Sequence, residues 1–414
     1  MKVLTFKAYY EPEKAASLYL TTNLIEDLAD YGFVVELYVP MPTRGISDEV
    51  REEYKQRKIE ELYDGKIKIY RFSLFKEYHS TVLRVIRYLI SNVIYLYKGI
   101  FSNGIDVIHV GSTPPTMGVV ATIIKKIKRV PLVYSLQDIF PDSLESTGLA
   151  KRNSLFWKIG RVIENYTYKN ADKIIVISED FKQNLKAKGV PEEKIEVIYN
   201  WVDENAVVPI ERKDNILFDK LNLSRNKFYV VYAGNLGHAQ NIEVILKAAQ
   251  ELLDNEDIKF IFFGGGKQEN YYKDMANSMG LKNIRFYPLL PYSLVSYVYS
   301  LGDVSIVSCK KGLGKSAMPS KTWSIMSAAT AVVANFDKNT DLQHIIEEND
   351  VGIFTSAGDV EDLKKAILKL FNERDLCDFM GKNGRDFIIN NLTREIGTRK
   401  YSNIIRNVGG DINV

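Results

Sequence analysis

The chain has 414 residues, 46% of them hydrophobic and 26% charged, which is the composition of a globular protein too long for one ordinary domain. Its formal net charge of +3 argues against a dedicated nucleic-acid-binding protein. The two cysteines, Cys309 and Cys377, have no metal-ligand neighbours in the sequence, so we expect no disulfide framework, and a reducing cytoplasm fits.

The first half of the chain alternates strand-like runs with helical patterns. Short runs rich in β-branched and aromatic residues indicate strands at 2–10, 34–40, 106–111, 132–138 and 173–178. Met1 leads directly into the first of them, so we expect no signal peptide. The second half repeats this rhythm, with strands indicated at 228–235, 258–266, 284–288, 304–309, 330–335 and 351–356. Apolar strands alternating with helices predict parallel sheets with helices on both faces.

Two such series in one chain predict two Rossmann-like domains of the α/β class, facing each other across a cleft. The polar, irregular segment 200–227 is the expected hinge, between an N-terminal domain at 1–205 and a C-terminal domain at 206–392. We expect the last helical stretch, within 393–414, to pack back on the N-terminal domain. Open α/β sheets bind ligands at the carboxyl ends of their strands, so the loops after strands are the places to search for chemistry.

One segment of the N-terminal domain has an unusual composition. Residues 82–101 are apolar and aromatic, with Arg84, Arg87 and Lys98 as their only charges, and 123–131 adds four more cations. No run of ~20 uncharged apolar residues exists, so we expect no membrane-spanning helix. Apolar side chains flanked by cations suit an anionic membrane surface, and we expect peripheral contact there. The alternative is a core helix with its cations in water.

Three glycine or proline segments follow strands of the C-terminal domain. In "YAGNLGHAQN" (232–241), Gly234 and Gly237 would let backbone N–H groups approach an anion at a helix start, and His238 lies on the same loop. A glycine kept there for close packing is the alternative.

The other two segments offer room for a nucleotide base. "FFGGGKQ" (262–268), with Gly265 and Lys267, leaves space for a flat ligand but lacks the G-x-G-x-x-G spacing of a dinucleotide site, so NAD is not supported. "FYPLLPY" (286–292), with Pro288 and Leu290, is a rigid strand end that can present backbone groups to a base.

The loop "KKGLGKSAMPSKTWSIM" (310–326) combines cations with a helix start. Ser320, after Pro319, is the expected N-cap, which places Lys321 in the first turn. A lysine there opposes the helix dipole unless an anion lies between them. The coincidence predicts a diphosphate site, and a solvated basic loop is the alternative. Three further cations crowd the same loop: Lys310, Lys311 and Lys315.

Together these segments resemble the GT-B glycosyltransferases of family 4, nearest the capsular polysaccharide, O-antigen and colanic acid branch, which includes N-acetylfucosamine-transferase-like members. The resemblance extends from residue 1 to about 405. Besides "YAGNLGHAQN", it is carried by "YYEPEKAASLYLTTNLIEDLADYGFVVELYV" (9–39), "VIHVGSTPPTMG" (107–118), "LQDIFPDSLESTG" (136–148), "VIYNWVD" (197–203) and "MPSKTWSIMSAATAVVA" (318–334).

The chain departs from the family pattern on the donor side. Family members commonly carry two glutamates spaced E-x7-E that hold the donor sugar and ribose, and here Ser316 and Ser324 stand at those positions. A serine can hydrogen-bond a hydroxyl but supplies no charge. Asn235 and Gln240 stand where an arginine and a lysine often cradle the diphosphate. The resemblance therefore leaves Lys321 and the helix start as the candidates to meet the phosphate charge.

On the acceptor side, the resemblance implies functional groups in loops of the N-terminal domain. Glu13 and Asp138 are the candidate catalytic carboxylates there, beside Lys321 as the donor-side catalytic group, and Glu13 alternatively caps a helix. The candidate acceptor-binding residues are Lys14, Ser112, Thr113 and Asp142. His109 alternates with apolar residues on a strand, so we expect a hydrogen-bonded core histidine.

The resemblance implies a retaining transfer of a sugar from a UDP-sugar to a polyprenyl-diphosphate-linked saccharide at the inner face of the cell membrane, in surface polysaccharide synthesis. The sugar implied is an N-acetylhexosamine or its 6-deoxy form. No metal and no cofactor beyond the nucleotide sugar are expected, since no D-x-D motif is present. A nucleotide-sugar 2-epimerase is one alternative, although the chain is poor in histidine. A catalytically silent partner subunit is another, suggested by the two serines.

Overall fold

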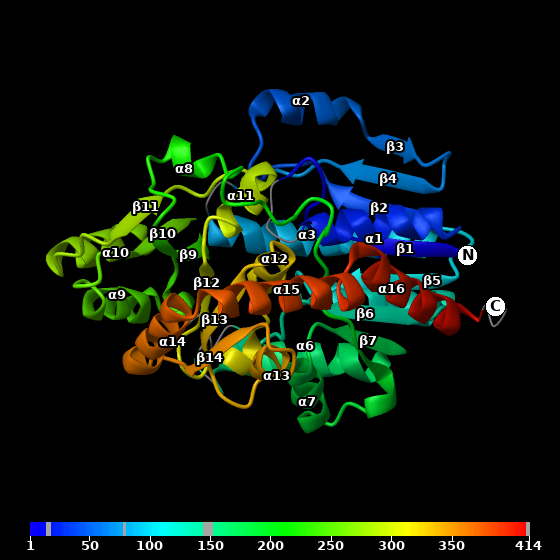
Figure 1. Ribbon diagram of the computed structural model, residues 1–414. Coiled ribbons are helices and arrows are strands. Elements are labelled where there is room, and N and C mark those ends of the chain that lie inside the picture. The colour runs from blue at the N-terminus through cyan, green and yellow to red at the C-terminus, as the bar shows by residue number, and fades with distance from the viewer. Residues whose placement is uncertain (14–17, 78–79, 144–150, 152, 411–414) are drawn as a thin grey trace. The chain divides into compact units, whose positions relative to one another are not determined.

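The computed structural model describes residues 1–13, 18–77, 80–143, 151 and 153–410 (Figure 1). The chain divides into two compact units, Met1–Asn200 with Glu395–Val414, and Trp201–Arg394. Each contains a mostly parallel sheet with helices packed on it, so the prediction of two α/β domains is confirmed.

The first unit contains an eight-stranded sheet in the order β3-β4-β2-β1-β5-β6-β7-β8, parallel apart from the β3–β4 pair. Its strands are β1 (Lys2–Phe6), β2 (Val34–Pro40), β3 (Ile59–Leu62), β4 (Ile67–Phe72), β5 (Val107–Gly111), β6 (Leu132–Leu136), β7 (Lys173–Val176) and β8 (Ile195–Val197). The central strands are buried throughout, which explains their continuous apolar runs. Strand β3 lies at the edge and is mostly exposed, with two glutamates, so its sequence carried too weak an apolar signal to be predicted.

Among its described residues, the first unit has six α-helices and a seventh that returns from the end of the chain. They are α1 (Leu18–Asp30), α2 (Asp48–Gln56), α3 (Thr81–Phe101), α4 (Met117–Lys128), α6 (Leu155–Asn170), α7 (Glu179–Ala187) and α16 (Arg394–Gly409). Helices α3, α4 and α6 each connect a strand to one that lies closer to the β8 edge, whereas α1 connects β1 to β2, closer to the β3 edge. Because parallel crossovers are right-handed, α1 lies on the opposite face of the sheet from the other three. Helix α4 packs between α3 and α6. Helix α16 lies beside α1, where the Thr398 hydroxyl donates to Asp27 over 2.8 Å.

The second unit contains a six-stranded parallel sheet in the order β11-β10-β9-β12-β13-β14. Its strands are β9 (Phe228–Asn235), β10 (Ile258–Gly265), β11 (Ile284–Tyr287), β12 (Val304–Ser308), β13 (Ala331–Phe336) and β14 (Gly352–Ser356). Its α-helices are α8 (Leu217–Lys220), α9 (Ile242–Glu251), α10 (Glu269–Ser278), α11 (Val295–Tyr299), α12 (Lys321–Ser327), α13 (Asp341–Glu348), α14 (Val360–Asn372) and α15 (Arg374–Asn391).

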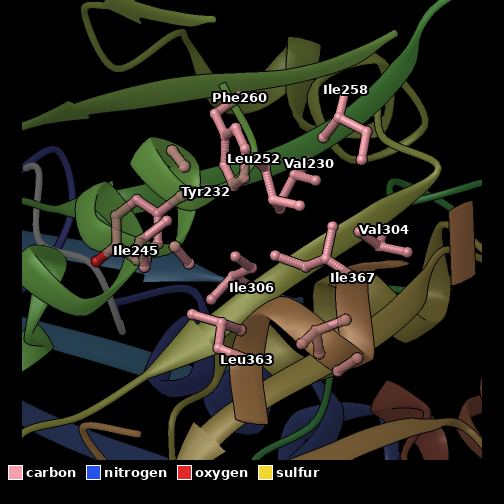
Figure 2. Packing of buried hydrophobic residues seen from close by; sticks show 14 of the residues in the cluster. Val230, Tyr232, Ile245, Leu252, Ile258, Phe260, Val304, Ile306, Leu363 and Ile367 are labelled. Atoms are coloured by element: carbon pink, nitrogen blue, oxygen red, sulfur yellow. The ribbon is translucent and has the colours of Figure 1, made fainter. Parts of the chain in front are cut away.

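The core of the second unit lies between the sheet and helices α9 and α14. Figure 2 shows Val230 of β9 and Ile306 of β12 on the sheet side, with Ile245 of α9 and Ile367 of α14 facing them. All four side chains are almost fully buried. Because every strand of this sheet is parallel, the loops after β9, β10, β12 and β13 emerge at one edge, and this packing holds that edge in place.

Candidate active site

Strand β9 approaches α12 closely at Gly234, one residue before the strand ends. Its φ of +143° is a conformation that L-residues rarely adopt. A Cβ at this position would also lie 2.9 Å from Nζ of Lys321. The backbone conformation at position 234 therefore favours glycine, and any larger residue there would also displace the end of the Lys321 side chain.

Lys321 is the first residue of α12, as the sequence predicted. The residue as a whole is partly exposed, but its Nζ is buried and makes no hydrogen bond to any residue that the structure describes. The ammonium lies 4.0 Å from the centroid of the Tyr232 ring, a cation–π contact. Burial lowers the pKa of Lys321 to about 7. A buried cation without an acceptor is costly, so this position is suited to an anion.

Ser320 precedes the helix without capping it, contrary to the prediction. Its φ of −58° and ψ of −21° are already helical, and its side chain makes no capping hydrogen bond. A capping hydroxyl needs an extended backbone to reach the N–H groups of the first turn. Pro319 accepts from the backbone N–H of Thr322 over 2.9 Å, which closes the turn instead.

The glycines of the 310–316 loop are engaged within the protein. The backbone N–H groups of Gly312 and Gly314 both donate to the Asp337 carboxylate, each over 2.8 Å at the closest. These N–H groups therefore already have an acceptor within the protein. Asp337 follows the carboxyl end of β13, where a carboxylate commonly has a role, although no motif in the sequence indicates it.

His238 contacts the basic loop instead of standing alone on the β9 loop. Its Nε2 lies 2.8 Å from Nζ of Lys310, and the Lys310 backbone N–H donates to the Ala239 carbonyl over 2.8 Å. The loops after β9 and β12 are thereby joined. Lys311 and Lys315 are exposed.

The positions that depart from the family pattern lie close to this junction. The Asn235 amide donates to Gln240 over 3.5 Å, and a Cβ on Gly237 would lie 2.6 Å from Asn235 Nδ2. Gly237 thus leaves room for the side chains that stand in the arginine and lysine positions. Ser324 lies three residues after Lys321 on α12, and Ser316 ends the short helix before it; both are partly exposed.

The expected base-binding residues lie at the same sheet edge. Gly265 ends β10 in register with Asn235 of β9. Lys267 and Pro288 are exposed, and Leu290 is partly exposed. Their donor-binding roles stay predictions.

In the first unit, Glu13 is buried and held by backbone groups. Its carboxylate accepts from the N–H groups of Thr43 (2.7 Å), Arg44 (2.9 Å) and Tyr10 (3.2 Å). Burial raises the pKa of Glu13, and these N–H groups oppose that rise. The carboxylate thus ties the loop after β2 to the loop after β1, while its catalytic role stays a prediction. Lys14 lies outside the described residues.

The other candidates of this unit follow β5 and β6. Asp138 is exposed just after β6, and Thr113 is exposed after β5. Ser112 is buried and accepts from the Gln137 backbone N–H over 3.2 Å, so it links these two loops.

Asp142 has structural partners that the sequence did not reveal. It pairs with Nζ of Lys188 over 2.9 Å and accepts from the Asn184 amide over 3.2 Å, which anchors it to α7 and the residue after it. Its acceptor-binding role stays a prediction. His109 is buried and contacts the Ser135 hydroxyl over 2.8 Å, so the expectation of a hydrogen-bonded core histidine is confirmed.

The described residues lack two kinds of feature. They include no cluster of three or more histidine, cysteine or acidic side chains suited to a metal ion. Nor does any described helix have the length and apolar character needed to cross a membrane.

Comparison with known proteins matches both units to glycosyltransferase families. Residues 19–206 match the model "Glycosyltransferase Family 4" and residues 213–387 match "Glycosyl transferases group 1". The chain is 27% identical to the probable glycosyltransferase WbjE of Pseudomonas aeruginosa, over 73% of this chain and 74% of WbjE. It is 25% identical to the putative colanic acid biosynthesis glycosyl transferase WcaI of Escherichia coli, over 84% and 86%.

A third relative has a defined acceptor in its name. It is the UDP-Gal:alpha-D-GlcNAc-diphosphoundecaprenol alpha-1,3-galactosyltransferase of Escherichia coli, 25% identical over 72% of this chain and 74% of the relative.

Solved structures share the fold across nearly the whole chain. Sucrose-phosphate synthase from Thermosynechococcus elongatus gives a TM-score of 0.75 at 15% identity, covering 98% of each chain. HepE of Anabaena, in complex with UDP, gives 0.71 at 17% identity, covering 98% of this chain and all of HepE. At such identities the likeness shows the fold alone, which is GT-B.

Proposed function

The chain belongs to the glycosyltransferases that join a family 4 domain to a group 1 domain, and from this we propose that it transfers a sugar from a UDP-sugar to a lipid-linked saccharide. The proposed binding of a UDP-sugar rests on one observation. The Lys321 ammonium is buried at the first turn of α12, beside Gly234, without a hydrogen-bond acceptor among the described residues. The diphosphate of a nucleotide sugar supplies the missing acceptor and the missing negative charge.

The names of similar proteins support the choice of donor and acceptor. HepE of Anabaena has been crystallised with UDP and with UDP-glucose, which favours uridine as the nucleotide. The galactosyltransferase of Escherichia coli acts on a diphosphoundecaprenol-linked sugar, which favours a lipid-linked acceptor. By the resemblance of the sequence, we propose an N-acetylhexosamine or its 6-deoxy form as the sugar and surface polysaccharide synthesis as the role.

The proposed reaction retains the anomeric configuration. The bond between the anomeric carbon and the diphosphate breaks, the acceptor hydroxyl oxygen bonds to the same face of that carbon, and the hydroxyl proton passes to the departing phosphate oxygen. Charge stabilisation of the leaving diphosphate by Lys321 is the main catalytic term, without a metal ion. Ser316 and Ser324 hydrogen-bond sugar or ribose hydroxyls in place of the usual glutamates. Asp138 and Glu13 serve the acceptor side.

The test measures UDP release from a panel of UDP-sugars by the purified full chain, with a lipid-linked saccharide as acceptor. The matched variants are Lys321→Ala and Lys315→Ala, the latter an exposed lysine six residues away. We expect Lys321→Ala to lower UDP affinity and turnover about a hundredfold and Lys315→Ala to change them less than threefold.

Other outcomes contradict the proposal in recognisable ways. Unchanged UDP affinity in Lys321→Ala would overturn the phosphate assignment. An epimerised sugar formed without acceptor identifies a 2-epimerase. Binding of UDP without turnover on any donor identifies a silent subunit.

A further inference from the structure

Helix α3 presents an apolar surface to the outside of the first unit. Among its residues whose side chains are described, Lys98 is the only charged residue in the exposed class. The others that are at least 39% exposed are all hydrophobic or aromatic: Val82, Val85, Ile86, Leu89, Ile90, Val93, Tyr97 and Phe101. Their spacing of three or four residues places them along one side of the helix.

The inward face of the same helix is partly polar, although it also buries the aromatic ring of Tyr95, which stacks on Phe6. Arg87 is only 1% exposed and donates to the carbonyls of Phe75 (2.6 Å) and Met41 (3.0 Å). Ser91 and Asn92 are buried as well, and the Asn92 amide donates to the Thr116 hydroxyl over 2.6 Å. A helix at a protein–water boundary has the opposite arrangement, with its apolar stripe inward. The outward face of α3 is therefore built for a medium less polar than water.

Helix α6 repeats this inversion. Leu155, Phe156, Ile159 and Val162 are between 50% and 76% exposed. On the inward side Glu164 is buried, accepts from Tyr168 over 2.5 Å and pairs with Lys188 over 3.1 Å. The composition of the sequence indicates a membrane-contacting surface at 82–101 and 123–131 but gives no such signal for this helix. Helix α4, which packs between the two, exposes Ile127, so the three helices form one surface, here called the apolar face.

The charges on the apolar face have one sign. Helices α3 and α4 contain no aspartate or glutamate, and the one acidic residue of α6 is the buried Glu164. The exposed cations on or next to these helices include Lys98, Lys126, Arg129, Lys158 and Lys169. A second copy of the chain on this face would oppose these cations to one another, whereas an anionic lipid surface complements them.

We propose that the apolar face of α3, α4 and α6 docks on the surface of an anionic lipid bilayer, with α3 and the first two turns of α6 as two hydrophobic anchors. The proposal deepens the proposed function, on which it rests only in that a lipid-linked acceptor lies in such a bilayer. The apolar side chains enter the interfacial layer, and the cations meet lipid phosphates at its surface.

The experiment is flotation of the purified full chain with vesicles. The vesicles contain phosphatidylethanolamine with phosphatidylglycerol, or phosphatidylcholine alone. Two variants remove one anchor each, Leu89→Glu with Val93→Glu on α3, and Phe156→Glu with Ile159→Glu on α6. Phe379→Glu is the matched control, because Phe379 is 53% exposed on α15 of the other unit.

We expect each anchor variant to lower the affinity for anionic vesicles at least tenfold and the control to leave it unchanged. Replacing Lys98 and Lys158 by glutamine should lower it several-fold on anionic vesicles only, and added salt should act in the same direction. UDP affinity and the melting temperature, measured on the same variants, should match the wild type, which shows that they fold.

Two results would overturn the proposal. One is anchor variants that bind vesicles as well as the wild type. The other is a wild-type dimer without vesicle affinity that the α3 variant converts to monomer, which would assign the face to a second copy. Failure of the proposed function looks different, because UDP-sugars would then not be turned over while vesicle binding persists.

Discussion

The two units depart from ordinary burial in opposite ways. The first unit places large apolar side chains outside, on α3 and α6. The second unit places a cation inside, because Nζ of Lys321 is buried without a hydrogen bond to the described residues. Helix α14 of the second unit follows the usual pattern, because it buries Leu363 and Ile367 and exposes Lys365.

Each departure raises the free energy of the protein in water, and each is relieved by a different environment. Apolar surface is stabilised by leaving water, and a buried ammonium is stabilised by an anion. The two should therefore be separable: changes at Lys321 should affect nucleotide binding but not lipid binding, and changes on the apolar face should affect lipid binding but not nucleotide binding.

The largest effect is expected from Lys321→Met. Methionine keeps the aliphatic volume and removes the charge, so UDP affinity should fall about a hundredfold. The ligand-free protein should instead become more stable, with the melting transition of the second unit raised by about 3–6 °C near neutral pH, because an uncompensated buried charge is gone. Calorimetry and UDP titration test both effects. A lower melting temperature of Lys321→Met would contradict the claim that the buried ammonium destabilises the ligand-free protein.

Gly234→Ala should act through the same lysine. The alanine Cβ would lie 2.9 Å from Nζ at a φ of +143°, so we expect about 1–3 kcal/mol lower stability and about tenfold weaker UDP binding. Gly280→Ala is the control, because Gly280 also has a positive φ but a Cβ added there would have no neighbouring atom within 4 Å. The control should lose stability and keep its UDP affinity. Equal UDP affinities in the two variants would show that the contact between position 234 and Lys321 does not influence UDP binding.

The pH dependence of UDP binding should report the protonation of Lys321. Burial lowers the pKa of Lys321 to about 7 in the free protein, and a bound diphosphate should raise it. Affinity should then be nearly constant well below pH 7 and fall by more than about tenfold between about pH 7 and pH 9, because binding there takes up a proton. Lys321→Met should show no such fall. The buried lysine also makes the stability of the ligand-free protein depend on pH. Its destabilising effect is greatest below pH 7 and disappears as the pH rises toward the ordinary lysine pKa.

The smallest effect is expected from Asp337→Asn, which keeps the shape but weakens the acceptor for Gly312 and Gly314. We expect about threefold weaker UDP binding and about 1 kcal/mol lower stability. Hydrogen exchange at the amides of Gly312 and Gly314 should accelerate. Unchanged exchange would show that Asp337 does not hold the loop.

The sequence predicts the parallel sheets well because their strands are buried on both faces and read as continuous apolar runs. It also predicts Lys321 at a helix start, because the neighbouring residues Pro319 and Ser320 indicate where the helix begins. It does not predict Asp337 as the acceptor for the glycine loop, because that contact joins residues more than twenty positions apart. Nor does it indicate which face of an amphipathic helix points outward. The exposed residues of α6 have ordinary core chemistry, and only the packing of Glu164 and Tyr168 reveals their orientation.

The position of α16 sets the order in which the chain can fold during its synthesis. A Cβ on Gly409 would lie 2.6 Å from the Met1 side chain, and the Tyr31 hydroxyl contacts Thr398 over 3.2 Å. Residues 394–409 leave the ribosome only after residues 201–393 have been translated. The second unit can therefore complete its sheet first, while the eight strands of the first unit wait for their final covering helix.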